Sequence, residues 1–432
     1  MLRKTAAGAL ARSARWLATR TEVNGIPVVV HNESGALRVA VTKELPGQRW
    51  IDVLTAAGCR VEVSQHPDTI LSNDTIKQFV GSKCDGVIGQ LTEVSRATPC
   101  RPTPPAPVPA PAHPPPPGPA PQDWNEDLFG HLKKAGAKAY SNYAVGYNNV
   151  DVQGASKHGI PVGNTPGVLT ETTAELAAAL TLAAARRVVE ADTFMRTHKY
   201  KGWLPTLFVG NLLQEKTLGI VGAGRIGAAY ARMLVEGHKM DLVYYDPYPN
   251  EKLERYVADY GALLAKHGER PVKVRRVETV DEVLREADVV SLHCNLDDST
   301  RHLINAERLD MMKRDAVLIN AARGPVIDET ALVAHLKANP EFKAGLDVFE
   351  DEPAMKPGLE ECDNAVIVPH IASASMWTRS GMATLAACNV AARLSGHPVW
   401  SDPNDITAFV DGPFADIPKA SPSIVNAKEV GL

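Results

Sequence analysis

Three polar side chains, Arg323, Glu352 and His370, each lie within four residues of the end of an apolar run that suits a buried strand. A guanidinium can bind a carboxylate through two parallel hydrogen bonds, and an imidazole can donate a proton near neutral pH. A carboxylate on the far ring nitrogen can hold the imidazole in place. Together the three residues can fill the roles that reduction of a 2-oxo acid would need, in which the carboxylate is bound while the carbonyl oxygen is protonated.

Each of these residues also has a structural interpretation when it is taken alone. Arg323 could be a strand cap or an ion-pair partner, Glu352 an exposed turn residue, and His370 a buried imidazole with satisfied hydrogen bonds. Their shared place favours the chemical interpretation, because ligands of open parallel sheets bind at the carboxyl ends of the strands. A fourth residue at a strand end, His293, is expected to be structural or to form a wall of the cofactor cleft.

A glycine-rich turn within residues 216–246 predicts where a dinucleotide binds. An apolar run precedes the sequence Gly-Ala-Gly-Arg-Ile-Gly, a helical pattern follows it, and a second apolar run ends on Asp246. This is the dinucleotide-binding fingerprint in its required context. Gly222 permits the tight turn, Gly224 lets the backbone approach the pyrophosphate, and Gly227 lets the helix pack close to the sheet. The pyrophosphate charge is expected at the helix N-terminus.

The alternation of strand and helix patterns predicts an α/β protein with two doubly wound parallel-sheet domains and a cleft between them. At 432 residues the chain is too long for one ordinary core. We expect residues 26–150 to form a smaller substrate domain and residues 151–371 a larger Rossmann domain that binds NAD. Residues 372–432 are expected to form a C-terminal helix and tail that return to the substrate domain.

The composition excludes several classes of partner. The net charge of -4 gives no electrostatic reason to expect nucleic acid or an anionic membrane. No apolar run is long enough to span a bilayer. The six cysteines form no CxxC pair or other metal-ligand spacing, so no metal site is expected.

Two segments depart from the globular pattern. Residues 1–25 are rich in arginine, with no acidic residue before Glu22, which predicts a transit peptide for the mitochondrion, or alternatively the chloroplast. A basic disordered tail would have the same composition. The chain ends without the Ser-Lys-Leu address, which argues against the peroxisome. Residues 95–122 are dominated by proline and predict either an extended surface insertion or a non-coding stretch retained in the gene model.

Several segments resemble the D-2-hydroxyacid dehydrogenase family, and within it the plant-type hydroxypyruvate reductases (glycerate dehydrogenases) of photorespiration. The segments are GIVGAGRIG (219–227), NAARGPVIDE (320–329), GLDVFEDEP (345–353), VPHIASAS (368–375), NTPGVLTETTAELAAALTLAAARR (164–187) and SPSIVNAK (421–428). The resemblance implies that Arg323 binds the substrate carboxylate, that His370 is the acid/base, and that Glu352 is its partner. It also implies a homodimer held mainly through the cofactor domain.

The same resemblance implies which residues contact the ligands. Loops of the smaller domain would close over the substrate with Gln90, Leu91, Val145 and Gly146. Asp246 would accept hydrogen bonds from the ribose and repel a 2′-phosphate, so NADH is expected over NADPH. The cofactor-binding residues implied are Gly222, Gly224, Arg225, Ile226, Gly227, Asp246, Ala321, Ala322 and Asp347.

The expected function is NADH-dependent reduction of hydroxypyruvate to D-glycerate, and of glyoxylate to glycolate. Two alternatives stay open at this point. One is a phosphoglycerate-type dehydrogenase, which is disfavoured because no regulatory domain follows the catalytic one. The other is an NAD-sensing binding protein that resembles the transcriptional corepressors of this fold. The sequence does not rank hydroxypyruvate against glyoxylate.

Overall fold

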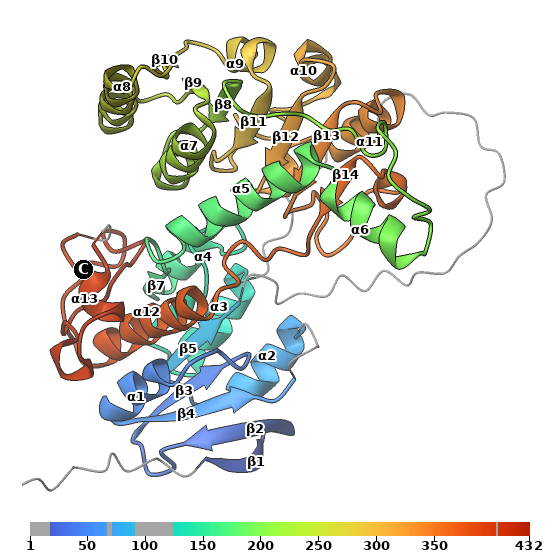
Figure 1. The fold of residues 1–432 in the computed structure, drawn as a ribbon. Coiled ribbons are helices and arrows are strands. Elements are labelled where there is room, and N and C mark those ends of the chain that lie inside the picture. The colour runs from blue at the N-terminus through green and yellow to red at the C-terminus, as the bar shows by residue number, and fades with distance from the viewer. Residues whose placement is uncertain (1–17, 67–70, 91–123, 403–404) are drawn as a thin grey trace, which may run out of the picture. The chain divides into compact units, whose positions relative to one another are not determined.

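The protein consists of two compact units, each built on a seven-stranded sheet (Figure 1). The first unit contains the described residues up to Val168 and those from Met376 onward, and the second contains Leu169–Ser375. The structure, a computed structural model, describes residues 18–66, 71–90, 124–402 and 405–432. The prediction of two parallel-sheet α/β units is confirmed, with two antiparallel strand pairs added at one edge of the first unit's sheet.

All seven strands of the second unit are parallel, in the order β10-β9-β8-β11-β12-β13-β14. The strands are β8 (Thr217–Val221), β9 (Asp241–Tyr245), β10 (Val274–Arg276), β11 (Val289–Leu292), β12 (Val317–Asn320), β13 (Lys343–Leu346) and β14 (Ala365–Ile367). The helices are α5 (Thr170–Ala185), α6 (Val188–Arg196), α7 (Arg225–His238), α8 (Glu251–Lys266), α9 (Val280–Glu286), α10 (Ala306–Met311) and α11 (Glu329–Ala338), with two 3-10 turns, η1 (Gly324–Val326) and η2 (Leu359–Glu361).

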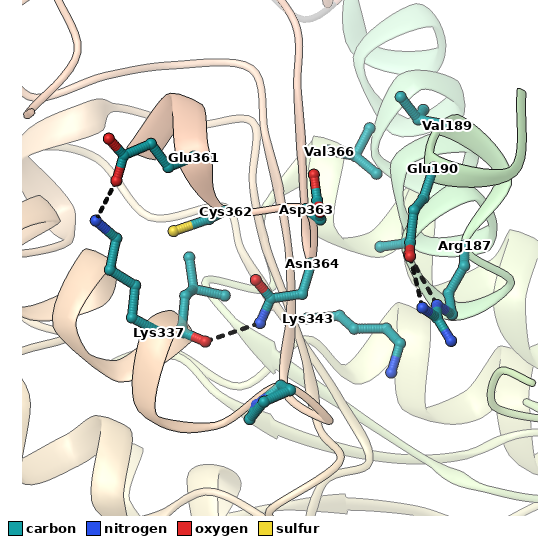
Figure 2. Close-up of a pocket in the computed structure, with 13 residues that line it drawn as sticks. Arg187, Val189, Glu190, Lys337, Lys343, Glu361, Cys362, Asp363, Asn364 and Val366 are labelled. Carbon is teal, nitrogen blue, oxygen red and sulfur yellow. Dashed lines mark hydrogen bonds and ion pairs between the residues drawn. The ribbon is translucent and has the colours of Figure 1, made fainter. Parts of the chain in front are cut away.

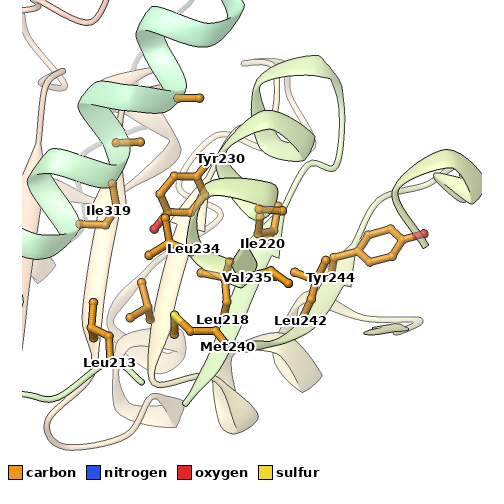
Figure 3. Packing of buried hydrophobic residues seen from close by; sticks show 14 of the residues in the cluster. Leu213, Leu218, Ile220, Tyr230, Leu234, Val235, Met240, Leu242, Tyr244 and Ile319 are labelled. Atoms are coloured by element: carbon orange, nitrogen blue, oxygen red, sulfur yellow. The ribbon is translucent and has the colours of Figure 1, made fainter. Parts of the chain in front are cut away.

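Both faces of the central part of this sheet are buried, because alternate residues of strands such as β8, β9, β11 and β12 pack into two different cores. Leu218 and Ile220 of β8 belong to the core beneath α5, α7 and α8 (Figure 3). Val221 and Val290 belong to the core beneath α9, α10 and α11. Burial on both faces explains why these strands read as continuous apolar runs in the sequence.

The alanine-rich pattern of residues 170–195 predicts one continuous helix, but the structure interrupts it. It ends at Ala185 as α5, and α6 begins at Val188. Arg187 between them adopts the left-handed conformation with φ 54° and binds Glu190 through two hydrogen bonds of 2.8 and 2.6 Å. The alanine-rich pattern gave no sign of this break, because a left-handed non-glycine residue has no composition signal.

The sheet of the first unit is mixed, in the order β1-β2-β4-β3-β5-β6-β7. β2 pairs antiparallel with both β1 and β4, and the remaining pairs are parallel. The strands are β1 (Thr19–Val23), β2 (Ile26–His31), β3 (Leu37–Val41), β4 (Cys59–Ser64), β5 (Gly86–Gly89), β6 (Ala139–Asn142) and β7 (Val162–Gly163). The helices are α1 (Arg49–Ala56), α2 (Asn73–Val80), α3 (Glu126–Lys134), α4 (Val152–Lys157), α12 (Met376–Leu394) and α13 (Thr407–Val410), with the 3-10 turn η3 (Phe414–Asp416).

The antiparallel edge corrects the expectation that residues 1–25 are separate from the fold. Residues 19–23 are strand β1, which pairs with β2 across a tight hairpin. Asn24 and Gly25 both have positive φ, 51° and 78°, as this kind of two-residue hairpin requires. The Asn-Gly pair is a sequence signal for such a turn, and the basic composition before it obscured this signal. Residues 1–17 of the predicted transit peptide and all of the predicted insertion 95–122 lie outside the described residues.

The first unit extends beyond residue 150, where we expected the domain boundary. Helix α4 and the two-residue strand β7 follow that position, and β7 pairs with β6. Helix α12 packs against α1, β5 and β6, so the C-terminal part of the chain contributes to this unit. The short β7 carries too small an apolar run to be recognised from the sequence.

Candidate active site

The glycine turn between β8 and α7 has the geometry that its three glycines suggested. Gly222 has φ 95°, and a Cβ there would lie 2.7 Å from the backbone of His293 and Cys294. A Cβ on Gly227 would lie 2.1 Å from the carbonyl oxygen of Gly222, so only glycine lets the helix approach the turn this closely. Gly224 differs, since a Cβ there meets no atom within 4 Å.

Asp246 at the end of β9 braces this turn. Its Oδ2 accepts a hydrogen bond from the peptide N–H of Ala223 at 2.8 Å, and its Oδ1 accepts one from Tyr248 at 2.9 Å. Asn250 donates from its side chain to the carbonyl of Ala223 at 2.7 Å. Gly224 is exposed and has open space beside it, which fits a pyrophosphate group at the N-terminus of α7 next to Arg225 and Ile226.

The segment after β12 is shaped by Asn320, a buried residue that the sequence analysis did not single out. Its Oδ1 accepts from the N–H of Ala322 at 3.0 Å, and its Nδ2 donates to the carbonyl of Arg323 at 2.9 Å. The side chain thus fixes the path of residues 321–323 after the strand. An asparagine at the last position of a buried strand was the available signal, because a buried amide requires several hydrogen-bond partners.

Arg323 follows directly on this turn, and its Nη1 donates to the carbonyl of Ala322 at 2.6 Å. Burial lowers the pKa of Arg323 from its ordinary value, while the negative charge of Glu352 opposes that change. Arg323 follows β12 and Glu352 follows β13, and these are neighbouring parallel strands of the sheet. The structure brings these two residues, predicted from separate strands, into one neighbourhood.

His370 and Glu352 form a direct pair. The ring Nδ1 lies 2.9 Å from Oε2 of Glu352, and the other oxygen, Oε1, accepts from the N–H of Phe349 at 3.0 Å. A carboxylate can only accept, so Nδ1 carries the donated proton and Nε2 is left to exchange one. His370 has φ 53°, an uncommon conformation for a residue other than glycine.

Asp347 at the end of β13 holds the backbone that carries His370. Its carboxylate is fully buried and accepts from the N–H of Ile371 at 2.6 Å and from that of Ala372 at 2.9 Å. Its carbonyl accepts from the N–H of His370 at 2.9 Å. Burial raises the pKa of Asp347, and the two backbone donors act in the opposite direction. Its carboxylate oxygens are therefore engaged with the His370 segment, a role the sequence analysis did not anticipate.

His293 lies behind the glycine turn in a polar group that the sequence did not reveal. Its Nε2 lies 2.8 Å from Oγ of Ser291, and its ring centroid lies 5.1 Å from that of Tyr230. Tyr230 in turn shares a 2.7 Å hydrogen bond with Thr181. Burial lowers the pKa of His293 to about 3, so the ring is neutral at physiological pH.

The residues expected to reach the substrate from the first unit lie at two strand ends of that unit. Gln90 follows β5, and its carbonyl accepts from the side chain of Asn149 at 3.2 Å. Val145 and Gly146 follow β6, and their carbonyls accept from asparagine side chains at 2.8 and 3.0 Å. Leu91 lies outside the described residues.

A cavity of about 340 Å³ in the second unit lies near the amino ends of its strands β13 and β14 (Figure 2). It is lined by Lys343, the first residue of β13, and by residues that precede β14. Asp347 and His370 lie at the opposite, carboxyl ends of these strands. None of the residues predicted for chemistry lines this cavity, so the candidate site is defined by the strand ends and not by it.

Neither a membrane-spanning helix nor a metal-binding cluster of side chains is found in the described part of the chain. Within it, no helix is both long and apolar enough to cross a membrane. Over the same residues, no group of three or more His, Cys, Asp or Glu side chains is arranged to hold a metal ion.

Comparison with known proteins identifies the family. A family model described as "D-isomer specific 2-hydroxyacid dehydrogenase, NAD binding domain" matches residues 178–372. A protein of Arabidopsis thaliana named "Glycerate dehydrogenase HPR, peroxisomal" is 57% identical over 407 residues, which cover 94% of this chain and 98% of that relative. The chain belongs to the D-isomer specific 2-hydroxyacid dehydrogenases. The resemblance stated from the sequence motifs is confirmed.

Solved structures of D-2-hydroxyacid dehydrogenases and related proteins share this fold. The TT0316 protein from Thermus thermophilus is 36% identical with a TM-score of 0.67, covering 84% of this chain and 98% of its own. An NADPH-dependent glyoxylate/hydroxypyruvate reductase from Sinorhizobium meliloti is 26% identical with a TM-score of 0.62. The match covers 83% of this chain and 95% of that protein. Proteins of this fold therefore include NADPH-dependent enzymes as well as NAD-binding relatives.

The Arabidopsis relative also corrects the predicted location. Its printed name places that protein in the peroxisome, which contradicts the mitochondrial prediction, the chloroplast alternative and the argument against the peroxisome. The composition of residues 1–25 was a weak basis for the prediction, because part of that segment is strand β1 of the fold.

Proposed function

We propose that this enzyme reduces hydroxypyruvate to D-glycerate and glyoxylate to glycolate with NADH, in photorespiratory glycolate metabolism. The observation that carries the proposal is the 2.9 Å contact between His370 Nδ1 and Glu352, on the same sheet edge as Arg323. Membership of the family supports it, and the Arabidopsis relative is named a glycerate dehydrogenase.

The proposed mechanism assigns one task to each of the three residues. The reduced nicotinamide, when bound, supplies the hydride. Arg323 binds the substrate carboxylate, because its planar guanidinium matches a carboxylate through two parallel hydrogen bonds. His370 gives a proton from Nε2 to the carbonyl oxygen as negative charge develops there. Glu352 holds Nδ1–H, which fixes the ring orientation and stabilises the imidazolium before it releases the proton.

The cofactor is proposed to lie along the sheet edge from the glycine turn to His370. Gly222, Gly224 and Gly227 would admit the pyrophosphate to the start of α7, with Arg225 and Ile226 beside it. Asp246 would accept from the ribose and repel a 2′-phosphate, which favours NADH over NADPH. The segment of Ala321 and Ala322, and Asp347 through the backbone it holds, would border the nicotinamide end.

Two further contacts belong to this proposal. Gln90, Leu91, Val145 and Gly146 would contact the substrate from the first unit. A homodimer would form through residues 188–212 of the second unit, where apolar side chains are exposed, including Trp203 at 79%. Exposed apolar side chains gathered in one segment are typical of a protein interface. The others exposed there are Val188, Val189, Met195, Tyr200, Leu204, Val209 and Leu212. Light scattering on a Trp203→Ser, Leu204→Ser variant would show a monomer, whereas a monomeric wild type would refute the dimer.

Steady-state turnover tests the activity directly. The wild type should oxidise NADH in the presence of hydroxypyruvate and of glyoxylate, and Arg323→Gln should nearly abolish both reactions. Arg301→Gln is the matched control, since Arg301 is an exposed arginine of the same unit and should be replaceable without loss. Absence of turnover by the wild type with these acids would refute the proposal.

A further inference from the structure

Glu329, the first residue of α11, is buried, with 3% of its surface exposed. Its Oε2 accepts from the peptide N–H of Glu350 at 2.7 Å, and its Oε1 accepts from that of Lys356 at 2.8 Å. Glu352 lies in the chain between these two donors. One buried carboxylate therefore joins both ends of the segment that carries the partner of His370.

The segment between the two donors is a tight turn. Asp351 and Ala354 form an isolated antiparallel bridge, and the N–H of Ala354 donates to the carbonyl of Asp351 at 3.0 Å. The ammonium group of Lys356 lies 2.7 Å from Oδ2 of Asp351. A turn closed in this way moves as one piece, so a displacement at its base also displaces Glu352 within it.

A second imidazole–carboxylate pair anchors the same turn. Oε1 of Glu350 lies 2.8 Å from Nε2 of His302, and its Oε2 accepts from the N–H of Glu329 at 3.3 Å. Glu329 and Glu350 thus bind each other's backbone. The backbone N–H of His302 donates to the carbonyl of Pro325 at 2.8 Å, which ties the backbone of His302 to the 3-10 turn that follows Arg323.

The base of the turn is also packed directly against the arginine segment. A Cβ added to Gly324 would lie 1.8 Å from the carbonyl oxygen of Phe349, so the two backbones are in closest contact there. The N–H of Phe349 donates to Oε1 of Glu352. The position of this one peptide segment therefore affects both Glu352 and the neighbour of Arg323.

We propose that Glu329, together with the His302–Glu350 pair, is a positioning unit that holds Glu352 against Nδ1 of His370 for proton transfer. Neither Glu329 nor its partners touch the substrate in this scheme, and they act through Glu352. The inference rests on the proposed role of Glu352 and His370. If the role of Glu329 were purely structural, its replacement would lower stability, and the effect would be the same whether or not Glu352 is present.

A double-mutant cycle between Glu329→Gln and Glu352→Gln separates these roles. Glutamine keeps the size of Glu329 but has a single acceptor oxygen, so only one of the two peptide donors keeps its partner. We expect Glu329→Gln to lower kcat for hydroxypyruvate at saturating NADH about tenfold, which is about 1.4 kcal/mol. In the Glu352→Gln background the same change should lower kcat less than about twofold, because the position of the turn no longer affects His370. Glu307→Gln, an exposed glutamate in the first turn of α10, is the matched control.

Each outcome decides between the alternatives. Equal losses in both backgrounds, or an unchanged kcat in Glu329→Gln, would overturn the positioning unit alone. An unchanged kcat in Glu352→Gln would overturn the role of Glu352 itself, and with it the inference. If Glu329→Gln does not fold, His302→Gln removes the second anchor and takes its place in the same cycle, with the same expected coupling to Glu352.

Discussion

Replacement of Gly224 by alanine separates ligand binding from folding in the glycine turn. A Cβ at this position meets no protein atom within 4 Å, and its φ of -68° suits any residue. The added methyl should therefore leave the melting temperature unchanged. The same methyl would occupy space proposed for the pyrophosphate and weaken a charge-assisted hydrogen bond worth about 1.5–3 kcal/mol. The Kd for NADH should then rise roughly ten- to a hundredfold.

Gly227→Ala is the contrasting variant, because its Cβ would lie 2.1 Å from the carbonyl oxygen of Gly222. Helix α7 must move to accept it, and overpacking of this kind typically costs about 1–3 kcal/mol of unfolding free energy. Gly237→Ala, also in α7 and without any atom within 4 Å of its Cβ, is the control: it should leave NADH binding unchanged and should not lower stability, since alanine favours a helix over glycine. Binding is measured by quenching of protein fluorescence and stability by thermal unfolding. A Gly224→Ala protein that binds NADH like the wild type would refute the placement of the pyrophosphate.

Three further predictions follow from the same geometry. His370→Gln should lower kcat by about 10²–10⁴-fold while the Kd for NADH stays unchanged, and a loss below fivefold in turnover assays would argue against its role as the acid. Asn320→Ala should lower kcat/KM for hydroxypyruvate, because residues 321–323 lose two hydrogen bonds that fix them, and unchanged kinetics would show that this turn does not place Arg323. The pKa of His293 is lowered to about 3 from 6.5, so the unfolded chain binds a proton below pH 6.5 that the folded chain does not, and stability should fall from pH 7 to pH 5. At pH 5 this lowers the free energy of unfolding by about 2 kcal/mol. His293→Gln should remove this loss and His267→Gln, at an exposed histidine, should not, as measured by urea unfolding.

Most of the fold was predictable because its signals are local. The helical patterns of residues 251–266 and 280–286 predict two helices, and the structure has them with the same bounds, Glu251–Lys266 and Val280–Glu286. The runs that became β8 and β12 are apolar throughout, since both faces of the sheet are buried. The signals failed where they were short or unusual, as in the two-residue strand β7 and in the break at Arg187, which depends on one left-handed residue.

The sequence by itself determined that the chain has a dinucleotide turn, that Arg323, Glu352 and His370 follow strands, and that the motifs belong to this family. These conclusions depend only on residue types and on spacing along the chain. The pairing of Glu352 with His370 was implied by the resemblance, and tertiary structure gave its 2.9 Å geometry. Tertiary structure alone decided that Asp347 uses both carboxylate oxygens to hold the His370 segment, and that Glu329 joins the two ends of the Glu352 turn. A buried carboxylate takes whichever backbone donors the fold brings to it, and those donors lie up to 27 residues away in the chain. No pattern of neighbouring residues specifies them.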